Sequence, residues 1–144
     1  MSDRATERKF AGRYTFRVRW SDLDALGHVN NSRFFTYFEQ ARVEWLEGTG
    51  WSGGNVAGGP VVATAACRFL KPIGYPATIE VSLFAGVPGT KSIPTYYEIR
   101  LAGNDELVAD GEAVMVWIDT ATGRSMPLPD PVRTLLDGLP DAAA

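Results

Sequence analysis

Apolar and polar residues alternate over residues 13–20. Two sets of four point to opposite sides of the chain: Tyr14, Phe16, Val18 and Trp20 on one side, and Arg13, Thr15, Arg17 and Arg19 on the other. A period of two residues is typical of a β-strand with one buried and one solvated face. We therefore predict a first strand here, preceded by a flexible leader over residues 1–12.

The periodicity then changes to that of a helix. At about 100° per residue from Ser32 to Glu47, seven apolar residues fall within one half of the circumference. They are Phe34, Phe35, Tyr37, Phe38, Ala41, Trp45 and Leu46. The 17 residues from Asn31 would form a rod of about 26 Å. Glu39 and Arg42 interrupt the apolar half, and their spacing of three residues predicts an ion pair.

The remainder of the chain is predicted to form a sheet. Residues 48–60 hold six glycines in thirteen positions, which favours a flexible loop. Apolar runs then predict four strands, at residues 61–70, 78–87, 92–101 and 107–119. Asp130 before Pro131 signals a short C-terminal helix, and residues 139–144 are expected to be a flexible tail.

This order of elements predicts one two-layer α+β domain over residues 13–138. Short turns between the last four strands require antiparallel neighbours, and one long helix must cover a five-stranded sheet. A single helix of this length cannot shield the whole sheet and both of its edges. We therefore expect the chain to form a homodimer.

Composition and charge narrow the classes of function. The 144 residues, 45% hydrophobic and 22% charged, are typical of one soluble globular domain. A net charge of −3 argues against a broad nucleic-acid-binding surface. The apolar runs fall short of the roughly 18 residues that span a bilayer, and the N-terminus lacks the apolar core of a signal peptide. We expect a cytoplasmic protein with no nucleic-acid or membrane partner.

Metal-ligating residues are few. Cys67 is the only cysteine and His28 the only histidine. One cysteine excludes an intrachain disulfide and a thiolate cluster, and one histidine excludes the two-histidine zinc motif. We therefore expect no metal site and no redox cofactor. Cys67 lies in the middle of a predicted strand, on its apolar face, and is expected in the core.

The segment with the most chemistry joins the first strand to the helix: Ser-Asp-Leu-Asp-Ala-Leu-Gly-His-Val-Asn-Asn, residues 21–31. Asn30 or Asn31 can cap the helix, and the remaining free amides and the helix dipole face the residues just before it. A carboxylate at Asp24 beside such donors suits acyl transfer, because the amides would stabilise an oxyanion while the carboxylate activates water or attacks the carbonyl. Capping and turn formation alone would select the same residue types, so both interpretations stay open. Asp22 is expected to support the turn.

The stretch W-S-D-L-D-A-L-G-H-V-N-N, followed by R-F-F-T-Y-F-E-Q-A-R-V-E-W-L, resembles hot dog fold thioesterases of the 4-hydroxybenzoyl-CoA thioesterase type. The likeness continues through P-V-V-A-T-A-A-C-R-F-L-K-P-I and G-E-A-V-M-V-W-I-D, over residues 13–120. It implies a long central helix wrapped by a curved five-stranded antiparallel sheet, in a homodimer that often pairs again into a homotetramer. The implied activity is hydrolysis of acyl-CoA thioesters, with coenzyme A as part of the substrate and no separate cofactor.

The resemblance also implies catalytic residues. Asp24 matches the catalytic aspartate, as base or nucleophile. The backbone amides around Asn30 and Asn31 match the group that polarises the thioester carbonyl. His28 follows the motif's glycine in a common version of the motif, where it would orient Asp24 or the substrate; a hydrogen-bonded loop histidine is the alternative.

Substrate-binding residues follow from the same resemblance. Gly27 matches the glycine that lets the turn come close, and Val29 and Phe35 are expected to contact the substrate. Lys91 and Ser92 fall near a segment that meets the phosphates of coenzyme A, although a solvated turn lysine would look the same.

Two other functions remain open at this stage. A hot dog hydratase or dehydratase of 3-hydroxyacyl thioesters would pair a histidine with a carboxylate, and His28 with Asp24 supplies such a pair. A non-catalytic acyl-CoA binding module would use the same fold without turnover. The many aromatic residues suggest an apolar acyl group, but the sequence does not determine its length, or coenzyme A against acyl-carrier protein.

Overall fold

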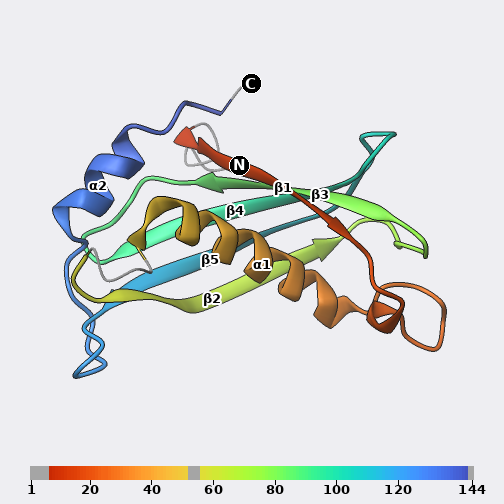
Figure 1. Cartoon of the computed structure of the whole chain (residues 1–144), viewed down its shortest axis with the longest axis horizontal. Coiled ribbons are helices and arrows are strands. Elements are labelled where there is room, and N and C mark those ends of the chain that lie inside the picture. The colour runs from red at the N-terminus through yellow and green to blue at the C-terminus, as the bar shows by residue number, and fades with distance from the viewer. Residues whose placement is uncertain (1–6, 52–55, 143–144) are drawn as a thin grey trace.

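The computed structural model describes residues 7–51 and 56–142. A long helix, α1 (Asn31–Thr49), crosses one face of a five-stranded antiparallel sheet (Figure 1). The strands are β1 (Lys9–Arg17), β2 (Gly59–Phe69), β3 (Thr78–Ala85), β4 (Ser92–Leu101) and β5 (Leu107–Ile118). A 3-10 turn, η2 (Trp20–Asp22), precedes α1, and a short helix, α2 (Asp130–Asp137), follows the sheet. This architecture confirms the predicted α+β hot dog fold. Within the described ranges, no helix is both long and apolar enough to cross a membrane.

The strand order is β1-β3-β4-β5-β2. The expected antiparallel neighbours are confirmed for β3, β4 and β5, which are joined by short turns. The expectation is wrong for β2, which lies at the opposite edge of the sheet from β1 and pairs with β5. Its link to β3 is not a hairpin: Ile73 is buried there, and the Val29 amide donates to the Ile73 carbonyl oxygen at 2.9 Å.

The core lies between α1 and the inner face of the sheet. The predicted apolar half of the helix is confirmed by its buried residues, which are Phe34, Tyr37, Phe38, Ala41 and Trp45. Phe38 stacks on Tyr97 of β4, with ring centroids 4.6 Å apart. Gly111 of β5 makes room for this ring, because a Cβ at that position would lie 2.5 Å from Phe38 Cε2.

The ion pair expected between Glu39 and Arg42 is not formed. Arg42 instead donates from Nη1 to the Tyr97 hydroxyl at 3.0 Å, and Glu39 is exposed. A spacing of three residues permits a helix pair, but the tyrosine hydroxyl in the core is a fixed acceptor that a local pattern does not reveal.

Both ends of the described chain depart from the expected leader and tail. Strand β1 already begins at Lys9, and residues 139–142 run beside it. The Phe10 amide donates to the Pro140 carbonyl oxygen at 2.8 Å. Residues 9–12 and 139–142 therefore belong to the folded domain, because each segment supplies backbone partners to the other; residues 1–6 and 143–144 lie outside the described residues.

Two further boundaries differ from the sequence-based expectation. The first strand ends at Arg17, and Trp20 in η2 is 74% exposed instead of joining the buried face. Within the glycine-rich segment, Trp51 is buried against Trp45 and Trp117, with centroids 5.2 and 5.7 Å away. The expectation of one flexible loop over residues 48–60 is thus wrong at residues 48–49, which end α1, and at residues 59–60, which start β2. Trp51 between them is held by packing, and residues 52–55 lie outside the described part.

Strand β2 is the most exposed strand of the sheet. It has exposed apolar side chains and, among the described residues, no strand along its outer edge. A bulge between Val62 and Thr64 reverses the side-chain alternation, so Val61 and Ala65 face opposite sides of the sheet. This strand is thus an edge with apolar groups and unpaired backbone.

Cys67 offers a pH-dependent test of this environment. It pairs with Gly111 and packs partly buried against the core, and burial, together with the nearby Asp110 carboxylate, raises the pKa of its thiol to about 11. At neutral pH we expect iodoacetamide to modify Cys67 about a hundredfold more slowly than an unperturbed thiol, because the thiolate fraction falls tenfold per pKa unit. Labelling followed by mass spectrometry should show a rate that still rises between pH 9 and 10. A plateau near pH 9 would contradict this prediction.

Candidate active site

The candidate site is the loop between η2 and α1, residues 23–30. Leu23 and Val29 form an isolated antiparallel bridge at its base. Inside it the Asp24 amide donates to the His28 carbonyl oxygen, and the Gly27 amide donates back to the Asp24 carbonyl oxygen, both at 3.0 Å. These bonds close a tight turn that carries Asp24 at a fixed place.

Gly27 is required by the backbone of this turn. Its φ of 80° lies in the left-handed region, which costs a residue with a Cβ roughly 1–2 kcal/mol. A Cβ there would meet no protein atom within 4 Å. The conformation, and not a close approach to other parts of this chain, therefore explains the glycine.

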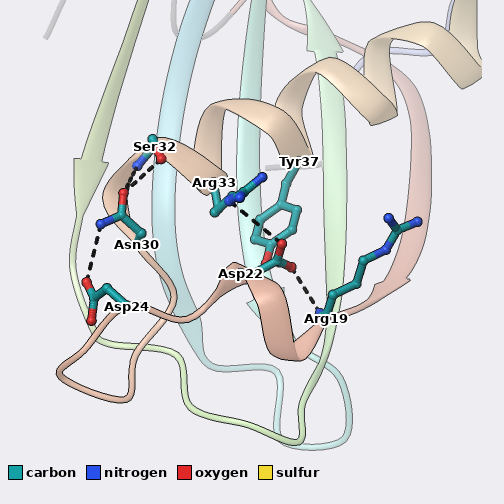
Figure 2. Close-up of polar contacts among 7 residues, drawn as sticks. All are labelled: Arg19, Asp22, Asp24, Asn30, Ser32, Arg33 and Tyr37. Atoms are coloured by element: carbon teal, nitrogen blue, oxygen red, sulfur yellow. Dashed lines mark hydrogen bonds and ion pairs between the residues drawn. The ribbon is translucent and has the colours of Figure 1, made fainter.

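Asp24 is tied to the start of α1 by Asn30 (Figure 2). Asp24 Oδ1 accepts from the Leu26 amide at 2.9 Å, and Oδ2 accepts from Asn30 Nδ2 at 3.3 Å. Asn30 is also the helix N-cap, because its Oδ1 accepts from Ser32 N at 3.0 Å and from Ser32 Oγ at 2.8 Å. The sequence allowed either Asn30 or Asn31 to cap the helix; the structure has Asn30 as the cap. Asn30 also links the positive end of the helix dipole to the Asp24 carboxylate.

Of the two backbone amides implied as oxyanion donors, one already donates a hydrogen bond within the chain and the other does not. The Asn30 amide donates to the Asp22 carbonyl oxygen at 2.9 Å and is occupied. The Asn31 amide, the first of the helix, has no acceptor among residues 7–51 and 56–142. The first amides of a helix have no intrahelical partner and carry the positive end of its dipole. The Asn31 amide is thus the one positioned to meet an external acceptor.

A hollow of about 280 Å³ opens beside Asp24. Its lining combines the predicted polar loop with apolar groups: Asp24, Leu26, His28, Val29, Asn31, Phe34, Phe69, Leu70, Lys71 and Pro72. Phe34 lies 5.1 Å from Phe69, ring centroid to centroid, across α1 and the end of β2. Lys71 is held by Glu106 at 2.6 Å. The hollow therefore has one polar end and one apolar wall.

The structure brings together most of the predicted site residues. Asp24, His28, Val29 and Asn31 line the hollow, and Val29 is itself buried. The His28 ring is exposed, with no hydrogen bond or ion pair among the described residues. The site residues predicted in this loop therefore lie around one hollow.

Three predicted substrate-binding residues lie elsewhere. Phe35 does not line the hollow; it is 38% exposed and packs edge-on against Phe38 at 6.2 Å. Lys91 and Ser92 precede and start β4, at the far end of the sheet from the Asp24 loop (Figure 1). Lys91 Nζ there donates to Ser125 Oγ at 3.4 Å. Within one chain these two residues do not join the site.

The apolar wall was missed by the sequence analysis. Phe34, Phe69 and Leu70 form it. Helical periodicity placed Phe34 and Phe35 on the same half of the helix and could not show which of the two lines the hollow. The signal that could have identified Phe69 and Leu70 is their position at the end of a predicted strand that must return near the helix start.

Behind the loop lies a buried carboxylate. Asp22 is 7% exposed and accepts from the Arg19 amide at 2.9 Å and from the Tyr37 hydroxyl at 2.7 Å, with Arg33 Nε 3.9 Å away. Burial, followed by the hydrogen bond to Asp22, raises the pKa of Tyr37 well above its usual range, so the phenol stays protonated and donates. These contacts agree with the supporting role expected for Asp22. No group of three or more His, Cys, Asp and Glu side chains suited to a metal ion occurs in the described part of the chain.

Known proteins share this fold. The chain is similar to the PA2801 protein of Pseudomonas aeruginosa, with a TM-score of 0.82 and 36% identity over 89% of this chain and 99% of that one. A thioesterase from Thermus thermophilus, solved with coenzyme A and zinc, gives a TM-score of 0.78 and 32% identity over 92% and 98%. The acyl-acyl carrier protein thioesterase ATL3 of Arabidopsis thaliana is 28% identical over 82% of this chain, which spans 63% of that protein.

The family model of the thioesterase-like superfamily matches residues 18–136, from the end of the first strand through most of α2. The match includes the whole loop that carries Asp24, the N-cap residue Asn30 and helix α1. Together with the relatives, it supports thioester hydrolysis as the general activity. This chain belongs to the thioesterase-like superfamily.

Proposed function

We propose that this protein hydrolyses acyl-CoA thioesters to the free acid and coenzyme A, with Asp24 as the base or nucleophile. The observation that carries the proposal is that Asp24 and Asn31, whose amide has no acceptor in the described residues, line one hollow with an apolar wall, while Asn30 links the Asp24 carboxylate to the start of α1. The relative solved with coenzyme A supports this choice of thiol carrier.

The chemistry follows from the positions of the two groups. With Asp24 as base, the carboxylate takes a proton from water as the water oxygen bonds to the thioester carbonyl carbon. The carbonyl oxygen becomes an oxyanion, which the Asn31 amide and the helix dipole stabilise. The intermediate then collapses, the C–S bond breaks, and the proton returns from Asp24 to the thiolate of coenzyme A.

A second copy of the chain would complete the site. The hollow of about 280 Å³ is open to solvent and is only about as large as the smallest typical ligand pockets, which span roughly 300–1,000 Å³. The apolar edge of β2 borders it through Phe69. Antiparallel pairing of two β2 edges about a two-fold axis would bring the Lys91 end of one copy toward the Asp24 end of the other. We therefore propose a homodimer as the active form, with a homotetramer as a further assembly.

A panel of thioesters tests the function. We expect free-thiol release from aliphatic and aromatic acyl-CoAs, measured with a chromogenic thiol reagent against enzyme-only blanks that account for Cys67. The same acyl groups on acyl-carrier protein form a second arm, which identifies the carrier. Loss of the crotonyl-CoA double bond without thiol release would instead favour the hydratase that pairs His28 with Asp24. Tight binding without any turnover would favour the acyl-CoA binding module.

A further inference from the structure

A series of hydrogen bonds leads from the second turn of α1 to Asp24. The Tyr37 hydroxyl donates to Asp22 Oδ2 at 2.7 Å, and the Asp22 carbonyl oxygen accepts from the Asn30 amide at 2.9 Å. Asn30 Nδ2 in turn donates to Asp24 Oδ2. The position of the Asp24 side chain therefore depends indirectly on Asp22, because Asn30 is hydrogen-bonded to both residues. The free Asn31 amide follows Asn30 directly and depends on the same contact.

The anchor of this series is rigid because it belongs to the core. Tyr37 is buried, and its ring packs against Phe34 with centroids 6.2 Å apart. Its hydroxyl reaches Asp22, a carboxylate that is almost fully buried. A buried carboxylate that loses a donor has little water to replace it and must shift or open its surroundings.

The two arginines near Asp22 are weaker anchors than Tyr37. Arg33 Nε is 3.9 Å from Asp22 Oδ1 and its side chain is about half exposed, so solvent screens the pair. Arg19 contributes only its backbone amide, and its guanidinium points away from Asp22 (Figure 2). Tyr37 is thus the buried side-chain donor through which α1 holds the loop.

We propose that Tyr37 is a positioning residue for catalysis: through its hydrogen bond to Asp22 it fixes the Asp24 carboxylate and the Asn31 amide relative to each other. The proposal rests on the function proposed above. Tyr37 does not line the hollow beside Asp24; with Asp22 it borders a separate hollow of about 520 Å³. The proposal therefore assigns its hydroxyl a role in the geometry of the site beside Asp24 and not in direct contact with a substrate there.

Tyr37→Phe removes only the hydroxyl and keeps the packed ring. We expect kcat to fall about tenfold, because small displacements of catalytic groups are costly, while KM stays within twofold. Thr95→Val is the matched control. Thr95 is also buried; its hydroxyl donates to the Ala113 carbonyl oxygen at 2.7 Å and shares a second hydrogen bond, of 2.9 Å, with the Tyr97 hydroxyl, and neither partner bonds to the Asp24 loop. This control should keep the wild-type kcat even though it loses two buried hydrogen bonds.

A double-mutant cycle separates positioning from general damage. In an Asp24→Asn background, Tyr37→Phe should change the residual kcat by less than twofold, because residues that act as one unit are not additive. A full additional tenfold loss in that background, or a wild-type kcat in the single Tyr37→Phe variant, would overturn the proposal.

Amide hydrogen exchange tests the same proposal without any substrate. In Tyr37→Phe the amides of Asp24 and Asn30, which donate to His28 and Asp22, should exchange about tenfold faster. They should be unchanged in Thr95→Val. If wild-type protein hydrolyses no thioester but the exchange responds as expected, the proposed function fails while Tyr37 still holds the loop. Unchanged exchange in Tyr37→Phe would overturn the positioning role itself.

Discussion

Replacing Asp24 by asparagine is expected to lower kcat for acyl-CoA hydrolysis by about 10²–10⁴-fold, the usual contribution of a general base. Asparagine is nearly isosteric and can still accept from the Leu26 amide, which holds Asp24 Oδ1 at 2.9 Å. It can neither take a proton from water nor attack a carbonyl. Thiol release from the best acyl-CoA of the panel measures the loss, with KM expected to change little.

The control for this variant is a second carboxylate on a turn. Asp105, exposed between β4 and β5, also has a left-handed backbone, with φ of 58°, and asparagine tolerates that conformation. Asp105→Asn should keep full activity, and both variants should unfold at the wild-type denaturant midpoint within error. Full activity in Asp24→Asn would leave the protein a thioesterase but would show that Asp24 does not perform the chemistry.

The motif around Asp24 was predictable because its chemistry is local. Two carboxylates, a glycine and two asparagines lie within ten residues before an amphipathic helix, so capping and a tight turn follow from short-range rules. The same rules could not choose between Asn30 and Asn31 as the cap. That choice depends on the Asn30 amide, which donates to the Asp22 carbonyl oxygen, eight residues earlier in the sequence.

Long-range pairing explains most of what sequence analysis missed. Residues 9–12 and 139–142 lack a strong pattern of their own: the first segment pairs with β3, and the second lies along the first. The periodicity of the sequence also gives no indication that β2 lies at the sheet edge opposite β1. The wall of the hollow depends on that position, because Phe34 meets Phe69 only when β2 ends near the start of α1.

Val62→Glu is expected to raise the dissociation constant of the proposed homodimer by at least about a hundredfold, an effect of roughly 2.7 kcal/mol or more. Val62 lies on β2 and is 42% exposed in the single chain. If two β2 edges pair, each copy buries one added carboxylate in the interface without a partner, and burying a charge is costly. Sedimentation velocity over a range of concentrations should show the shift to monomer.

Val43→Glu makes the same chemical change on a different surface. Val43 is 39% exposed and lies on the side of α1 opposite the buried residues of that helix, so a solvent-exposed substitution there should leave assembly unchanged. If the second copy completes the hollow beside Asp24, Val62→Glu should also lose thiol-releasing activity as dilution separates its subunits, whereas Val43→Glu should not. A Val62→Glu protein that stays dimeric would place the interface elsewhere. A monomeric but fully active one would show that a single chain already holds everything the reaction requires.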